Sequence, residues 1–99
     1  MLSPMPWSLY LVRTREGSLY TGIALDVDKR LAEHSAGLRG AKALRGRGPL
    51  ELVYRAEVGD RGLAQGLEHR IKRLAKADKE LLVLSAPSAD ELMARFGLK

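Results

Sequence analysis

The sequence predicts a small α/β (α+β) fold, in which helices pack on a mixed three-stranded antiparallel sheet in the order ββαβααα. Three observations predict it. Two apolar runs flank a polar turn at Gly17, a later run alternates apolar with polar residues, and several helical stripes each follow a capping residue. Ninety-nine residues suit one domain. We therefore expect a single domain over 1–99, with its core at about 7–84 and a last helix at about 88–96.

The first two strands are expected at 6–14 and 19–23, joined through Gly17. The loop length decides whether Tyr10 and Tyr20 share a face, because side chains alternate along a strand. A two-residue loop separates them, whereas a three- or five-residue loop, or a bulge near Gly17, places them together. Tyr10, Tyr20 and Arg30 recur at intervals of ten, and two phenols with a guanidinium suit chemistry on phosphate. We therefore predict the shared face, with the tyrosines about four residues, or ~13 Å, apart along the ribbon.

A first helix is predicted between Asp26, a good N-cap, and Gly37, a residue typical just past a helix end. The apolar stripe of this helix includes His34. Arg30 lies one turn earlier, beside that stripe. Both residues should therefore lie on the flank of the buried face, where a charged head can reach solvent.

Residues 50–58 predict a third strand with one buried face, since the apolar residues alternate strictly with the others. The expected buried face consists of Leu50, Leu52, Tyr54, Ala56 and Val58.

Three more helices should complete the fold. The longest runs from Asp60 to about residue 76 and carries Glu68 at the boundary between core and solvent. A short helix is expected over 78–84. The last one follows a capping box that starts at Ser88.

The charge of the chain favours a polyanion as partner. Seventeen Lys and Arg against twelve Asp and Glu give a net charge of +5. Segment 38–49 carries four basic residues and no acid, which suits contact with a nucleic-acid backbone or simple solvation. The residues predicted to bind nucleic acid are Arg39, Lys42, Arg45 and Arg47, with Lys72 extending the patch.

Several classes of protein are excluded or disfavoured. The chain has no cysteine, which excludes disulfides and thiolate metal sites and fits a reducing compartment. The first ten residues lack the features of a signal peptide. No stretch approaches the apolar length needed to span a membrane. We therefore expect a cytoplasmic protein that does not bind membranes.

Ordered motifs then suggest a family. Ser8-Leu9-Tyr10, Tyr20-Thr21-Gly22, Arg30 with His34, and Glu68 follow one another along the chain. This arrangement resembles the GIY-YIG nuclease domain, over roughly residues 7–84. It is most similar to the small stand-alone bacterial members, whose activity is poorly defined. The segment GAKALRGRGPLELVY, residues 40–54, resembles the same group.

The resemblance implies hydrolysis of DNA phosphodiester bonds with one divalent metal ion and little sequence preference. It implies that Glu68 holds the metal, that Tyr20 activates water with help from Tyr10, and that Arg30 and His34 complete the site. Mg²⁺ is the expected ion, with Mn²⁺ as an alternative. The family also suggests branched or damaged DNA as a substrate and DNA repair as a process.

Elementary chemistry agrees with these roles. A single carboxylate can hold Mg²⁺, because that ion keeps several waters. The fork of donors on Arg30 matches phosphate oxygens. A free phenol has a pKa near 10, so a tyrosine acts as a base only where that pKa is lowered.

Other readings of the same residues stay open. Tyrosines in strands often only pack, Arg30 could pair with Glu33 or Asp26, and Glu68 could be a surface acid. The main alternative function is a catalytically weak or inactive nucleic-acid-binding domain of the same fold. A third is an interaction module with purely structural tyrosines. The oligomeric state stays open as well.

Overall fold

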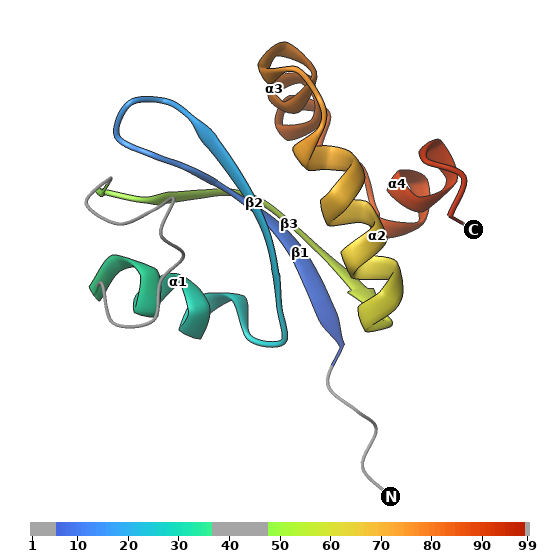
Figure 1. The fold of residues 1–99 in the computed structure, drawn as a ribbon, viewed down its shortest axis with the longest axis horizontal. Helices are drawn as coiled ribbons and strands as arrows, with labels where there is room; N and C mark the ends of the chain where they lie inside the picture. The colour runs from blue at the N-terminus through green and yellow to red at the C-terminus, as the bar shows by residue number, and fades with distance from the viewer. Residues whose placement is uncertain (1–5, 37–47, 99) are drawn as a thin grey trace, which may run out of the picture.

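The computed structural model describes residues 6–36 and 48–98, and within these ranges three antiparallel strands form one sheet. The strands are β1 (Trp7–Arg13), β2 (Leu19–Ala24) and β3 (Glu51–Gly59), in the spatial order β2-β1-β3. The middle strand, β1, is buried along its central five residues, as its dense apolar sequence predicts. The predicted fold class and the order ββαβααα are confirmed (Figure 1).

The β1–β2 turn is a three-residue loop, which confirms that both tyrosines share a face. Thr14 N–H donates to Ser18 O, and Gly17 N–H donates to Thr14 O, each at 2.9 Å. Gly17 has a φ of +89°, a conformation that glycine adopts without strain. The resulting register pairs Tyr10 with Gly22 and Val12 with Tyr20.

The expected separation of the two tyrosines is wrong. In the observed register they are offset by two residues rather than four, and their ring centroids are 6.5 Å apart instead of ~13 Å. The loop of residues 15–17 is centred on Glu16, whereas an offset of four needs a loop centred on Gly17, so Tyr10 pairs with Gly22 instead of Ala24.

The helices lie on the two faces of the sheet. Helix α1 (Val27–Ala36) covers one face, whereas α2 (Arg61–Lys72), α3 (Lys76–Ser85) and α4 (Ala89–Arg95) cover the other (Figure 1). Leu9 and Leu11 pack with Leu67 of α2, while Val12 packs with Val27 of α1. The alternation along β1 therefore supplies both cores.

Capping side chains set the helix starts. Asp26 and Asp60 each accept a backbone N–H three residues later, at 3.0 and 2.9 Å. Ser88 and Glu91 form the predicted capping box. Helix α2 ends at Lys72, earlier than expected, because its last carbonyls bond to residues three positions on and so tighten the final turn. Helix α3 then starts at Lys76, two residues before the predicted position.

The prediction of one buried face on β3 is wrong. Leu11 pairs with Tyr54, but Val12 pairs with Leu52, so a bulge leaves Val53 as an extra residue. Leu52 therefore packs on the α1 side, whereas Tyr54 packs on the side of α2. The alternating sequence alone cannot reveal this change of face.

No helix among residues 6–36 and 48–98 has the length and apolar character needed to cross a membrane.

Candidate functional site

The site begins with Tyr10, which crosses from the central strand to the sheet edge. Its partner in the register is Gly22 of the edge strand β2. A Cβ atom built on Gly22 would lie 2.6 Å from both Cζ and Oη of Tyr10. The Tyr10 ring therefore lies across Gly22, and only a glycine there leaves space for it.

Three rings gather on the α1 face. Tyr10 Oη is 3.2 Å from Nε2 of His34, which is only 4% exposed. The rings of Tyr20 and His34 meet edge to face, with centroids 6.0 Å apart. The helix that Asp26 caps thus delivers His34 to both tyrosines.

Burial sets the charge states of this cluster. Burial raises the pKa of Tyr10 to about 12, with further increases from Tyr20 and Glu68, against the lowering effect of the Arg30 charge and hydrogen bond. Burial, followed by the Arg30 charge, lowers the pKa of His34. At neutral pH Tyr10 is therefore protonated and His34 is neutral. Arg30 donates to the phenol oxygen, and the tautomer of His34 decides which group donates in the hydrogen bond between Tyr10 Oη and His34 Nε2.

Arg30 connects this buried cluster with solvent. Its Nη1 is 3.4 Å from Oε1 of Glu33, within α1, and the side chain stays partly exposed. The methylene groups of Arg30 therefore pack against the protein, whereas its guanidinium donors lie near the surface, where a phosphate oxygen can reach them.

Glu68 and Lys72 approach from the other side of the sheet. They lie on α2, which packs against the face opposite to α1, but α2 also contacts the edge strand β2. Lys72 Nζ lies 5.9 Å from the centroid of the Tyr20 ring and 3.5 Å from Oε2 of Glu68. The Glu68 charge raises the pKa of Tyr10. Both α2 side chains therefore reach the rim of the tyrosine cluster around the β2 edge.

The donor set would suit a hydrated divalent cation held by few protein ligands rather than a closed metal cage. Within the described ranges, no group of three His, Asp or Glu side chains is placed to hold a metal. The Glu68 side chain is 22% exposed and supplies carboxylate oxygens. Mg²⁺ often binds through one or two carboxylates, waters and substrate phosphate. An ion at Glu68 would compete with the Lys72 ammonium for the same carboxylate.

A pocket of about 530 Å³ adjoins the cluster through Arg30. The sequence predicted neither this pocket nor the role of Gly22. A glycine inside a strand often marks a close approach of another group, and this signal could have indicated the role of Gly22. The pocket has no comparable signal, because distant segments form it. Its lining residues are Trp7, Ile23, Ala24, Leu25, Asp26, Lys29, Arg30 and Glu33.

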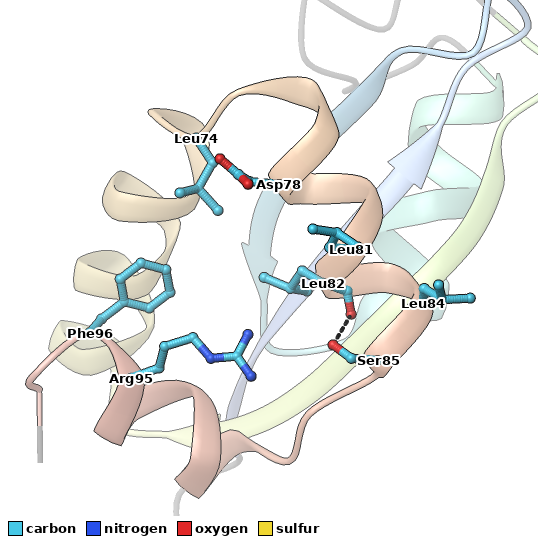
Figure 2. Close-up of a pocket in the computed structure, with 8 residues that line it drawn as sticks. All are labelled: Leu74, Asp78, Leu81, Leu82, Leu84, Ser85, Arg95 and Phe96. Carbon is cyan, nitrogen blue, oxygen red and sulfur yellow. Dashed lines mark hydrogen bonds between the residues drawn. The ribbon is translucent and has the colours of Figure 1, made fainter.

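Another pocket of about 530 Å³ lies on the opposite side of the sheet, between α3, α4 and the turn after α2 (Figure 2). It is lined mostly by leucines together with Phe96, and none of the predicted site residues contributes to it. Four predicted nucleic-acid contacts lie outside the described residues: Arg39, Lys42, Arg45 and Arg47.

Comparison with known proteins gives consistent matches. Residues 6–81 match the GIY-YIG catalytic domain. A UPF0213 protein of Yersinia enterocolitica is 54% identical over 88 residues, covering 89% of this chain and 90% of the relative. A UPF0213 protein of Yersinia pestis is 56% identical over 86 residues, covering 87% and 90%.

A solved structure agrees with them. The solution NMR structure of a UPF0213 protein from Bacillus halodurans is 39% identical, covers 80% of this chain and 83% of that one, and has a TM-score of 0.53. The Tyr10–Gly22 crossing and the adjoining α1 and α2 side chains thus lie within a matched domain. This chain belongs to the GIY-YIG domain family, among the UPF0213 proteins.

Proposed function

We propose that this protein is a divalent-metal-dependent endonuclease that hydrolyses DNA phosphodiester bonds with little sequence preference. The observation that carries the proposal is the meeting of Tyr10, Tyr20, Arg30 and His34 on one face, with the Glu68 carboxylate at its rim. The family match to a catalytic domain supports it.

The geometry suggests a division of labour. Arg30 offers donors to the scissile phosphate, where negative charge increases as water adds. Because burial raises the pKa of Tyr10 to about 12, Tyr10 keeps its proton at neutral pH and acts as a hydrogen-bond donor, not as the base. We assign the contact with the attacking water to Tyr20, which lies between His34 and Lys72. His34, neutral and buried, holds the Tyr10 hydroxyl in place.

Glu68 would hold the divalent ion, Mg²⁺ or Mn²⁺. When bound, such an ion supplies Lewis-acid stabilisation of phosphate charge and favours deprotonation of bound water. Lys72 can take over a phosphate contact when its partner carboxylate binds a cation.

A second candidate function is nucleic-acid binding with weak or no catalysis. One observation favours it: in the part of the chain that the structure describes, no cluster of three ligating side chains accompanies Glu68. The net charge of +5 suits binding in either case.

The test compares Mg²⁺-dependent cleavage of plasmid, single-stranded and branched DNA by the native protein, Glu68→Ala and Tyr20→Phe. We expect each variant to lose at least about 100-fold in rate, because each loses a group that acts on the reacting phosphate or water. Glu57→Ala, at an exposed position of β3, serves as the matched control and should cut normally. Circular dichroism verifies folding.

Each other outcome has a meaning. Native-like cutting by both variants would refute the assigned site. Binding of DNA by the native protein without any cleavage supports the second function. No binding even at low salt contradicts both.

A further inference from the structure

The pocket beside Arg30 combines an apolar wall with balanced charge. Trp7, Ile23 and Leu25 contribute the wall, and Leu25 is 44% exposed. The positive charges of Lys29 and Arg30 are balanced by two acidic residues that also line the pocket. One of these, Asp26, already accepts the Lys29 backbone N–H at 3.0 Å. A pocket of this character suits a neutral, flat, partly polar group better than a second phosphate.

The pocket also has the right size and position for part of a nucleotide. Its volume of about 530 Å³ lies within the usual range for small-molecule sites. Arg30 both lines the pocket and hydrogen-bonds to Tyr10 in the ring cluster. A nucleotide whose phosphate contacts Arg30 would therefore have its base within reach of Trp7 and Leu25.

A base that is paired and stacked in a duplex cannot enter such a pocket without leaving the helix. A base in a single strand, a flap or a distorted junction is already available, and its entry costs less. Apolar and aromatic surfaces accept any base, since every base has a flat π-face. This surface therefore selects for the state of the strand rather than for its sequence.

We infer that the pocket formed by β1, β2 and α1 binds an unpaired DNA base next to the phosphate at Arg30. The substrate class is thus DNA with unpaired nucleotides at the cutting position. This inference rests on the proposed function, because it takes DNA as the ligand of Arg30. The pocket of similar volume between α3, α4 and the turn after α2 shares no residue with the ring cluster and serves as a control surface (Figure 2).

Trp7 is the only tryptophan of the chain, so its fluorescence reports directly on the pocket. The probes are a short single-stranded oligonucleotide, a strand of equal length made of abasic sites, and a blunt duplex. All three are titrated at fixed salt without divalent metal. We expect quenching of Trp7 by the first strand only, and about tenfold weaker binding of the abasic strand, which keeps the phosphates but lacks the bases.

Two leucine variants test the location. Leu25→Glu places a charge on the apolar wall, at an exposed position where folding should tolerate it, and should remove the preference for bases. Leu84→Glu is the matched control, because Leu84 is 82% exposed and lines the other pocket. It should leave both quenching and binding unchanged. Anisotropy of labelled DNA measures binding independently of Trp7.

The outcomes separate this inference from the proposed function. Equal affinity for the ordinary and abasic strands overturns the base pocket, even where plasmid cleavage depends on Glu68 and Tyr20. Equal quenching by the duplex, or loss of base preference in Leu84→Glu, overturns it as well. Base-dependent quenching without cleavage supports the pocket and contradicts the nuclease.

Discussion

At the scale of single residues, Gly22 decides the geometry of the ring cluster, because it has no Cβ atom. Tyr10 comes from the central strand, and a Cβ atom at Gly22 would lie 2.6 Å from its ring. Because Gly22 has no Cβ, the ring can lie across the edge strand and its hydroxyl reaches His34. The glycine of the Tyr20-Thr21-Gly22 motif thus provides the space that the Tyr10 ring occupies.

The replacement Gly22→Ala tests this account. The added carbon would lie 2.6 Å from Tyr10 Oη, and that ring is only 1% exposed, so it has little room to move aside. We expect a loss of about 1–3 kcal/mol in the free energy of unfolding, as for other overpacked sites. Urea denaturation measures the loss, and NMR of the His34 ring reports the displaced hydroxyl.

Gly66→Ala is the matched control. A Cβ at Gly66, inside α2, would meet Leu98 at an ordinary distance of 3.5 Å. Alanine also favours a helix over glycine, so this variant should gain up to about 1 kcal/mol. If Gly22→Ala unfolded at the same urea concentration as the native protein, the Tyr10 ring would not be fixed across the strand.

At the scale of elements, a charged pair ties the end of β1 to α3. Arg13 donates to both carboxylate oxygens of Glu80, at 2.7 and 2.8 Å, and Lys76 donates to one of them at 2.9 Å. The hydrogen bond from Arg13, followed by that from Lys76, lowers the pKa of Glu80 to about 2. The sequence did not predict this contact, because 67 residues separate the two partners.

Acid titration should reveal this pair. In the folded protein the pKa of Glu80 is about 2, below its usual value of 4.5. The unfolded chain therefore binds a proton at Glu80 more readily than the folded protein does. The stability from the pair is therefore present above about pH 4.5 and is lost as the pH falls towards 2. We expect Glu80→Gln to flatten this part of the curve of unfolding free energy against pH.

Arg13→Gln gives the matching test from the other side of the pair, since it removes the largest cause of the lowered pKa. It should flatten the same region, and the double variant should add little to either change. Stability is measured by urea unfolding from pH 2 to 7. An unchanged acid slope in both variants would contradict the assigned linkage.

At the scale of the whole molecule, the sheet divides two cores, and side chains from its two faces approach one another at the β2 edge. The tyrosines lie on the α1 face, whereas Glu68 and Lys72 belong to a helix on the other face. They approach one another only because β2 is an edge strand and α2 packs against it. The candidate site is thus a property of the edge of the fold.

Segment 38–49, with its four basic residues, gives a prediction about the salt dependence of DNA binding. Each phosphate contact adds about 0.9 to the slope of log affinity against log salt on duplex DNA. Changing all four basic residues to glutamine should therefore lower the magnitude of this slope by about 3.6. The residues are Arg39, Lys42, Arg45 and Arg47.

Binding isotherms across a series of salt concentrations measure the slope. Arg95→Gln, in α4 and away from the ring cluster, is the control and should leave the slope nearly unchanged. A fourfold variant with the native slope would mean that these residues do not contact the phosphates.

The sequence predicted those features that a few neighbouring residues decide. Asp60 and Ser88 start helices because each bonds to an amide three positions later. The shared face of Tyr10 and Tyr20 was predicted from the chemistry of the two phenols and Arg30, because the turn sequence around Gly17 left the loop length open. The bulge at Val53 could not be predicted, because its cause lies in pairing with a distant strand.

By itself, then, the sequence determined the order of elements, the caps and the side chains available for chemistry. Only the tertiary structure decided how these side chains meet: Tyr10 across Gly22, Glu68 around the β2 edge, and Trp7 beside Arg30 in one pocket. The physical reason is range. Hydrogen-bonded turns and helical periodicity act over a few residues, whereas packing joins atoms from segments that are far apart along the chain.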